Sequence, residues 1–387
     1  MPTTTDVVVV GAGIAGASCA FHLAGLGIKT TLIEKLHPGS GPTGRSSAIC
    51  HAFYLDPALS RLGARGTEIL RNIPALTGGP SCFHQVGMLW VVGEKAAPDW
   101  QAAVTRIKRE GAEIETLPPD EVTRMTPDFS QEGVALGVWE PTCGYADPYD
   151  AANTLARAAG SLGARVLLNT AVAQITANGA RVKGIETTKG EKIAADAVVI
   201  ATGVWTKPLV AKLGVDLPIH VERHPMAVLD APGRAAKVLP FAWCDDILCN
   251  YARPEGDSSI LVGTWSGGGT GLRNMAMERP TRIADPESYD EIVDAEESAG
   301  ILAYIAPRVP AIESLGIRKG YAGLYDMSPD DNPIIDRLPG VEGAYVICGS
   351  SGHGFKLGPA VGEEMARLVT SGRSELLAPF SLDRFDR

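Results

Sequence analysis

The chain opens on the stretch Val7-Val-Val-Val-Gly-Ala-Gly-Ile-Ala-Gly16, and a second apolar segment, 30–33, ends at Glu34. The apolar run 7–10 predicts a buried strand, and the small residues after it predict a tight turn into a helix. This order of strand, glycine-rich turn, helix, strand and acid is typical of a βαβ unit that binds a dinucleotide.

Each residue of this motif has a physical task. Gly11 permits the tight turn, Gly13 lets the backbone approach a pyrophosphate, and Gly16 lets helix and strand pack closely. The helix N-terminus offers unpaired N–H groups to the phosphates, and Glu34 can accept the hydroxyls of a ribose. The residues expected to contact a dinucleotide here are Gly11, Ala12, Gly13, Ile14, Ala15, Gly16, Glu34 and Lys35.

Length and composition narrow the class of protein. A chain of 387 residues predicts about two domains. The net charge of −10, with no basic stripe, argues against a nucleic-acid partner. The seven cysteines form no CxxC pair, so reduced thiols in a cytoplasmic protein are the simplest interpretation.

Two other features of the sequence allow alternative interpretations. Residues 7–28 carry no Asp, Glu, Lys or Arg, as in a signal peptide or membrane anchor, but Asp6 precedes them and glycines interrupt them. No other stretch predicts a membrane span. His220 and His224 have the i, i+4 spacing of metal ligands on a helix, but prolines bound 217–226, which predicts a strand and no metal site.

The order of predicted elements indicates a discontinuous nucleotide-binding domain. A Gly/Pro/Ser-rich loop, 38–47, suits a ligand-lining connection, and a hairpin turns at Lys189-Gly190 before the buried strand 197–200. We therefore expect an α/β fold whose Rossmann-like domain comprises 1–80, 145–217 and 320–387, with an inserted antiparallel α+β substrate domain at 81–144 and 218–319. Helices are predicted at 59–73, 102–111, 147–159, 288–305 and 360–368, and strands at 86–92, 226–229, 247–251, 260–263 and 345–348.

Four motifs together resemble the FAD-dependent amine oxidoreductases of the D-amino-acid oxidase superfamily. They are Gly11–Gly16 with Glu34, then Ala201-Thr-Gly-Val-Trp205, then the segment 323–336, and finally Gly349-Ser-Ser-Gly-His-Gly-Phe-Lys356. The branch of sarcosine oxidase, dimethylglycine dehydrogenase and glycine oxidase is the most similar. The last two motifs favour FAD over NAD, and the glycines before Pro359 would point a positive helix end at the flavin.

The resemblance implies which residues contact the cofactor. Val172 is assigned from the extra strand that usually meets the adenine. Gly323 stands where monomeric sarcosine oxidases carry a flavin-bound cysteine, so non-covalent FAD is expected, although His51 could be an alternative attachment. The further FAD contacts implied are Arg45, Ser46, Ser47, Val172, Ala201, Thr202, Gly203, Trp205, Gly323, Gly352, His353, Gly354, Phe355 and Lys356.

The implied reaction oxidises a secondary or N-methylated amine to an imine by hydride transfer to flavin N5, and the amine must be neutral to react. By the same resemblance, Lys356 contacts a substrate carboxylate and Tyr325 lines the pocket. The catalytic candidates are Tyr325, Lys356, His51 and Tyr251. Plain core packing is the preferred interpretation of Tyr251, Trp243 and Trp265, with an aromatic wall around the amine as the alternative.

The sequence also departs from the family pattern. Cys50 stands where relatives commonly have an arginine that pairs with the substrate carboxylate, so the substrate lacks a carboxylate, holds it against Lys356 alone, or is larger. The oxygen-activating lysine of the monomeric oxidases has no clear counterpart, with Arg253 and Arg273 the nearest cations. Oxidase and dehydrogenase therefore both stay open, with O2 or an electron-transfer protein as acceptor.

The sequence is also compatible with two other functional classes. One is a flavin-binding subunit of a heteromeric amine, proline or sarcosine dehydrogenase with little activity alone, so a homo- or hetero-oligomer is expected. The other is an NAD-dependent dehydrogenase, which a flavin absorption band in the purified protein would exclude.

Overall fold

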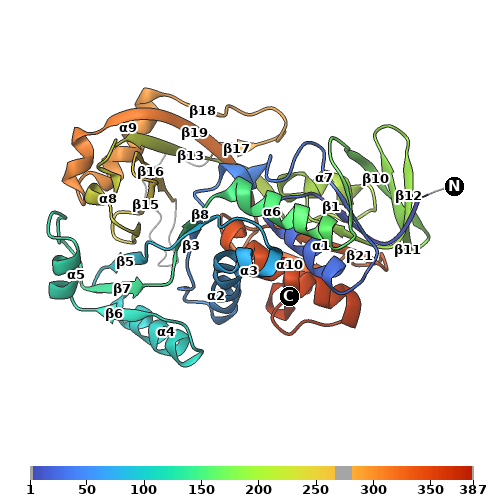
Figure 1. The fold of residues 1–387 in the computed structure, drawn as a ribbon, viewed down its shortest axis with the longest axis horizontal. Coiled ribbons are helices and arrows are strands. Elements are labelled where there is room, and N and C mark those ends of the chain that lie inside the picture. Colours follow the sequence, from blue (N-terminus) through green and yellow to red (C-terminus); the bar gives the residue numbers. More distant parts are fainter. Residues whose placement is uncertain (1–2, 266–280, 386–387) are drawn as a thin grey trace.

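The computed structural model describes residues 3–265 and 281–385. Its first sheet has a parallel core in the order β9-β2-β1-β12-β21, extended by the antiparallel strands β11, β10 and β20. Figure 1 shows this sheet beside the N-terminus. Its strands are β1 Thr3–Val10, β2 Thr30–Ile33, β9 Arg165–Leu167, β10 Val172–Asn178, β11 Arg181–Thr187, β12 Lys192–Ile200, β20 Ile334–Arg337 and β21 Ala344–Cys348.

Both faces of this sheet are covered, which explains the unbroken apolar run of β1. Val7 and Val9 pack with a helical layer on one face, while Val8 and Val10 pack with β10, β11 and α7 on the other. The helices of the first layer are α1 Ile14–Gly25, α2 Pro57–Arg71, α3 Ile73–Thr77, α6 Pro148–Ser161 and α10 Gly354–Ser371, and α7 spans Thr206–Ala211.

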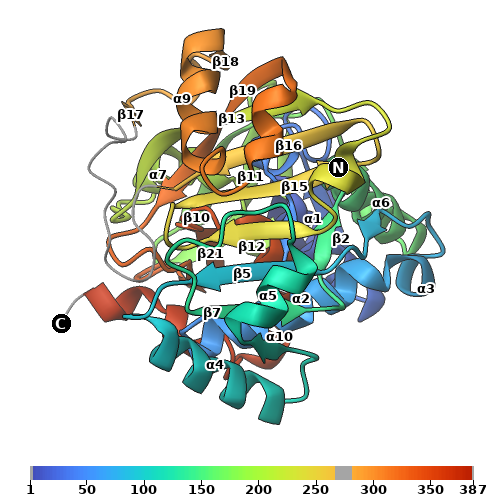
Figure 2. The ribbon, with the colours of Figure 1, turned by 90° about the vertical axis from the view of Figure 1, so that its left-hand side faces the viewer.

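The second sheet is almost entirely antiparallel, in the order β18-β19-β13-β16-β15-β14-β5-β7-β6, with only the β14–β5 pair parallel among its described pairs. Figure 2 shows its strands running across the view with α9 and α4 at its two ends. Its strands are β5 Met88–Val92, β6 Glu115–Leu117, β7 Leu136–Glu140, β13 His220–Asp230, β14 Ala242–Asp245, β15 Asn250–Glu255, β16 Ser259–Thr264, β17 Thr281–Ile283, β18 Ile292–Val293 and β19 Gly316–Met327.

Short elements connect the two sheets and cover the second. A small sheet of β3 Ile49–Cys50, β8 Gly144–Ala146 and β4 Phe83–His84 lies between the large ones. The helices of the second unit are α4 Ala97–Arg109, α5 Pro119–Met125, α8 Ala235–Val238 and α9 Ala295–Ile305, and the 3-10 turns are η1 Pro42–Arg45, η2 Gly203–Trp205, η3 Pro310–Ser314, η4 Ala378–Phe380 and η5 Leu382–Phe385.

The expected fold class is confirmed: a discontinuous Rossmann-like sheet carries a second, antiparallel unit. The expected domain boundaries stay predictions, and the one at 319/320 falls inside β19, because this strand runs unbroken from the second unit toward the first. Among the described helices, none combines the length and apolarity needed to cross a bilayer.

Three helices begin at least five residues from the predicted start, and the strand predicted at 247–251 begins only at Asn250. The helix predicted at 102–111 begins at Ala97. The helix predicted at 288–305 begins at Ala295, because 292–293 pair with β19 and Asp294 caps the helix by accepting from the Glu297 N–H. The helix predicted at 360–368 begins at Gly354, so Pro359 lies inside α10 and not at its start. The first-turn N–H groups of a helix need no intrahelical partner, so glycines there are compatible with helix.

The segment with His220 and His224 is a strand, as predicted. Both rings lie beside Glu222: its carboxylate oxygens are 2.7 Å from His220 Nε2 and 3.4 Å from His224 Nε2. Burial alone would raise the pKa of Glu222, but the two adjacent histidines hold it below its usual value. Across residues 3–265 and 281–385, no group of three or more His, Cys, Asp or Glu side chains could hold a metal ion.

Candidate active site

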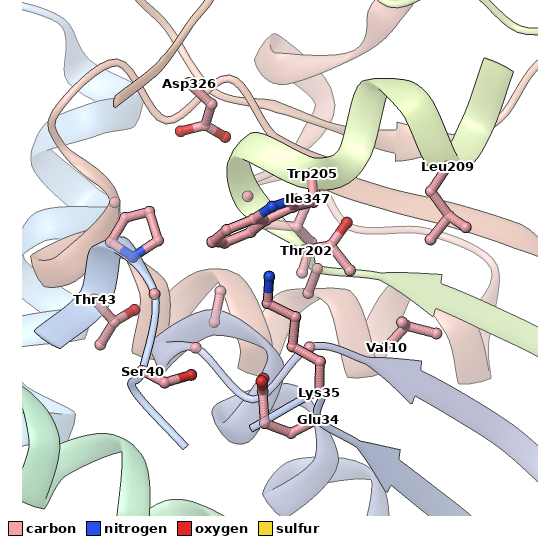
Figure 3. Close-up of a pocket in the computed structure, with 18 of the residues that line it drawn as sticks. Val10, Glu34, Lys35, Ser40, Thr43, Thr202, Trp205, Leu209, Asp326 and Ile347 are labelled. Atoms are coloured by element: carbon pink, nitrogen blue, oxygen red, sulfur yellow. The ribbon is translucent and has the colours of Figure 1, made fainter. Parts of the chain in front are cut away.

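A cavity of about 420 Å³ opens where β1, β2 and β12 end at their carboxyl edges (Figure 3). Ligands of open parallel sheets bind at this edge. Most of the residues expected to contact a dinucleotide line it: Gly11, Gly13, Ile14, Ala15, Glu34, Lys35, Ser46, Val172, Ala201, Thr202, Gly203, Trp205, Gly352, Gly354 and Phe355.

The backbone at the floor of the cavity has no room for side chains. Gly11 has φ +99°, and a Cβ there would lie 2.4 Å from the Ala201 carbonyl oxygen. A Cβ on Gly16 would lie 2.0 Å from the Gly11 carbonyl oxygen. These contacts bring the start of α1 against the turn after β1, so that the helix N-terminus faces the cavity.

Glu34 is held in place by the same turn. Its Oε2 accepts from the Ala12 N–H and its Oε1 from the Leu36 N–H, both at 2.9 Å, and the residue is buried. Each carboxylate oxygen has a second lone pair, so Glu34 can still accept ribose hydroxyls. The glycine cradle and this acid fit the nucleotide half of FAD, which these residues would hold.

Seven predicted cofactor residues do not line the cavity. The Arg45 guanidinium instead bonds Glu291 through Nη2 at 2.8 and 2.9 Å, and donates to the Ser40 carbonyl. Arg45 turns away because Glu291, in the second unit, offers a carboxylate that the sequence motif does not reveal. The others that do not line the cavity are Ala12, Gly16, Ser47, Gly323, His353 and Lys356.

The cavity also has lining residues that the sequence did not single out, although four of them, 40–43, lie in the loop expected to line a ligand. Lys35 pairs with Glu287 at 2.5 Å, and its Nζ lies 3.9 Å above the Trp205 ring, as Figure 3 shows for Lys35 and Trp205. Thr43 accepts from the Ile14 N–H at 3.1 Å, and the glycine-rich loop 38–47 was the signal for it. The residues not singled out are Ser40, Gly41, Pro42, Thr43, Thr170, Ala171, Ala173, Pro208, Leu209, Lys212, Glu287, Leu324, Asp326, Ile347 and Ser350.

Lys356 lies in the first turn of α10, directly after the cavity-lining Gly354 and Phe355. The side chain is half-buried, with Nζ 5.8 Å from the centre of the Tyr54 ring, and it has no hydrogen-bond or ion-pair partner among the described residues. Burial lowers the pKa of Lys356 to about 8, against the opposing influence of Cys50, Cys244 and Glu140. A buried cation without a partner is costly, so an anion is the ligand it suits.

Two histidines flank Lys356 and interact with it electrostatically. His51 is buried, its ring 4.8 Å from that of Tyr54, and the Tyr54 hydroxyl lies 3.1 Å from His353 Nδ1. Burial, and then Lys356, lower the pKa of His353 to about 3. Burial, Lys356 and His353 hold the pKa of His51 well below its usual value, so both rings are neutral.

Tyr325 lines the cavity and contacts Tyr251, another of the aromatic candidates. Its ring stacks on His224 at 3.8 Å and packs so closely on Gly352 that a Cβ there would lie 2.6 Å from the tyrosine ring. The Tyr325 and Tyr251 hydroxyls interact, and burial followed by Tyr325 raises the pKa of Tyr251 well above its usual value. Tyr251 in turn stacks on Trp265 at 6.2 Å.

Trp243 and Arg253 make structural contacts instead. Trp243 lies in the core of the second unit and donates to Asn250 Oδ1, so core packing and not a wall describes it. Arg253 donates to the Ser47 carbonyl, pairs with Glu255 at 2.7 Å and covers the Tyr145 ring. Arg273 lies outside the described residues.

Cys50 is fully buried in β3 beside Lys356, and burial raises its pKa to about 12.

The fold and this cavity are those of a dinucleotide-dependent enzyme that carries a second, antiparallel unit. A family model described as FAD dependent oxidoreductase matches residues 6–368, and the chain belongs to this family. It is therefore an FAD-dependent oxidoreductase, as the resemblance implied.

Individual relatives are similar over nearly the whole chain. The chain is 28% identical over 375 residues to 4-methylaminobutanoate oxidase (formaldehyde-forming) of Paenarthrobacter nicotinovorans, covering 96% of this chain and 44% of that enzyme. It is 26% identical to monomeric sarcosine oxidase of Bacillus sp. (strain B-0618), covering 99% and 97%. The crystal structure of L-proline dehydrogenase from P. horikoshii superimposes with a TM-score of 0.88 at 28% identity, covering 100% and 99%. The chain thus spans less than half of the first relative.

Proposed function

We propose that this protein oxidises a secondary or N-methylated amine that carries a carboxylate to the corresponding imine. Lys356 carries the proposal, because it is an unpaired, half-buried ammonium next to the cavity-lining start of α10. FAD, when bound, supplies the two-electron acceptor. The three relatives support the substrate class, since 4-methylaminobutanoate, sarcosine and proline are all secondary amines with a carboxylate.

In this proposal each residue binds or orients the substrate. The Lys356 ammonium holds the carboxylate, and its positive charge disfavours an ammonium on the substrate nitrogen. Tyr325, fixed between His224 and Gly352, sets the boundary between substrate and cofactor. Cys50 stands where relatives commonly have an arginine, and its buried thiol cannot pair with a carboxylate, so Lys356 alone holds that group. A cytoplasmic location and assembly into an oligomer stay predictions.

Anaerobic flavin reduction tests the proposal with amines matched for the carboxylate. The FAD-loaded protein is mixed with sarcosine or dimethylamine, and with proline or pyrrolidine, and the flavin absorbance is followed. We expect Lys356→Met to lose about 10- to 100-fold in kred/Kd for the carboxylate-bearing amines, the value of one charged hydrogen bond, and to lose the preference over their partners.

The control is Lys319→Met, since Lys319 is exposed and also lies 5.6 Å from a tyrosine ring. This variant should match the wild type. A yellow protein that no amine reduces would contradict an independent enzyme and favour the subunit alternative, which gel filtration with candidate partners would then address. Admission of O2 to the reduced protein separates an oxidase from a dehydrogenase.

A further inference from the structure

His51 presents one free hydrogen-bond acceptor beside Lys356. Its Nδ1 lies 3.1 Å from the Phe53 carbonyl oxygen. A carbonyl only accepts, so Nδ1 carries the proton of the neutral ring and Nε2 keeps its lone pair. Within 3–265 and 281–385, Nε2 has no hydrogen-bond partner, and it is not among the side-chain atoms sealed from solvent without a partner.

The direction of this acceptor is fixed by its neighbours. The Trp90 ring meets the His51 ring edge-on at 4.8 Å and 86°. The buried Glu140 carboxyl accepts from the Trp90 indole at 3.1 Å and from the N–H groups of Ala52 and Phe53 at 2.7 and 3.1 Å. One buried group therefore holds both the loop that carries His51 and the ring that packs against it.

Two other polar groups of the cluster already have partners within the protein. The Tyr54 hydroxyl bonds His353, and Glu140 has donors on both oxygens. A proton on His51 would meet the charge of Lys356 in a buried site, so the ring serves as an acceptor and not as a base that holds a proton. In an α-amino acid the nitrogen is two bonds from the carboxylate carbon, so a carboxylate on Lys356 places the nitrogen within this cluster.

We infer that His51 Nε2 accepts a hydrogen bond from the substrate N–H, and so selects secondary over tertiary amines; this rests on the proposed function. A neutral secondary amine has one N–H and one lone pair. Engaging the N–H leaves the lone pair free to form the carbon–nitrogen double bond as hydride leaves. A neutral tertiary amine has no N–H to donate. When it binds, it would exclude water from His51 Nε2 and leave this nitrogen without a hydrogen bond.

Matched amine pairs test this selection. Sarcosine is compared with N,N-dimethylglycine, and proline with N-methylproline, by anaerobic flavin reduction that yields kred and Kd separately. We expect the wild type to favour each secondary amine, and His51→Phe to reduce that preference about tenfold, the worth of one hydrogen bond in a buried site. His51→Gln, which restores an acceptor oxygen, should recover part of the preference.

The control variant is His84→Phe, because His84 stacks on Tyr145 at an exposed position outside the cluster. It should keep the wild-type preference. If His51→Phe binds FAD and lowers the rates of both members of each pair equally, His51 has only a structural role and the inference is refuted. If the wild type reduces with neither member, the proposed function fails first, and the two failures are thereby distinguished.

Discussion

Removing the Lys356 ammonium should stabilise the protein while it impairs substrate binding. Burial lowers the pKa of Lys356 from 10.5 to about 8. At about 1.4 kcal/mol for each pKa unit, the charged form costs the folded state about 3 kcal/mol at pH 7. This is an upper value, because the half-buried ammonium reaches water in the site. Lys356→Met should therefore raise the free energy of unfolding by up to about 3 kcal/mol.

The pH dependence identifies the cause. Below pH 8 the lysine is charged in both the folded and unfolded wild type, so the full cost applies. Between pH 8 and 10.5 the folded protein has lost the proton that the unfolded chain still holds, so wild-type stability rises with pH. The difference in free energy of unfolding between Lys356→Met and the wild type should fall to about half of its pH 7 value by pH 9.5.

Urea unfolding of both proteins at pH 7 and pH 9.5, with equal free FAD, measures these differences. Propionate, a carboxylate without an amine, should stabilise the wild type and not the variant, since only the wild type has an ammonium to bind it. Two results would refute the reasoning that Lys356 is an unpaired, half-buried cation. One is a variant that is less stable than the wild type at pH 7, and the other is the same difference in free energy of unfolding between the two proteins at pH 7 and pH 9.5.

Two further perturbations follow from the site. Burial raises the pKa of Glu140 to about 7, so the folded state holds a proton that the unfolded chain loses near pH 4.5; wild-type stability should fall by about 3 kcal/mol from pH 4.5 to 7 through this group. Glu140→Gln should flatten that slope in unfolding titrations, and an unchanged slope would place its cause elsewhere. Gly16→Val would drive a side chain into the Gly11 carbonyl, so the purified variant should retain far less flavin absorbance than wild type; full retention would show that this turn does not set the cofactor site.

The sequence predicted those parts of the molecule that local patterning determines. The alternation of glycine and apolar residues at 7–16 is enough to place β1, the turn and α1, because the close contacts of Gly11 and Gly16 exclude other residues. The family motifs then led to Lys356 and Tyr325. Their surroundings were not predictable, since Tyr54 and Glu140 come from segments without a motif and meet Lys356 only through packing.

The partners of charged residues were likewise not predictable from the local sequence. Arg45 was predicted to face the cofactor, but it pairs with Glu291, which is distant in sequence and carries no pattern of its own. Glu287 reaches the cavity in the same way, by its pairing with Lys35. The start of α10 was misplaced because Pro359 indicates a helix start, whereas packing and a permissive first turn extend the helix back to Gly354.

The central claim is that FAD and an amine meet between the start of α10 and Tyr325. Stopped-flow absorbance of the FAD-loaded protein, mixed with sarcosine or proline without oxygen, tests it most directly. We expect the yellow flavin to bleach at a rate that saturates with amine and that depends on Lys356. A protein that takes up no FAD, or whose bleaching is unchanged in Lys356→Met, would contradict it.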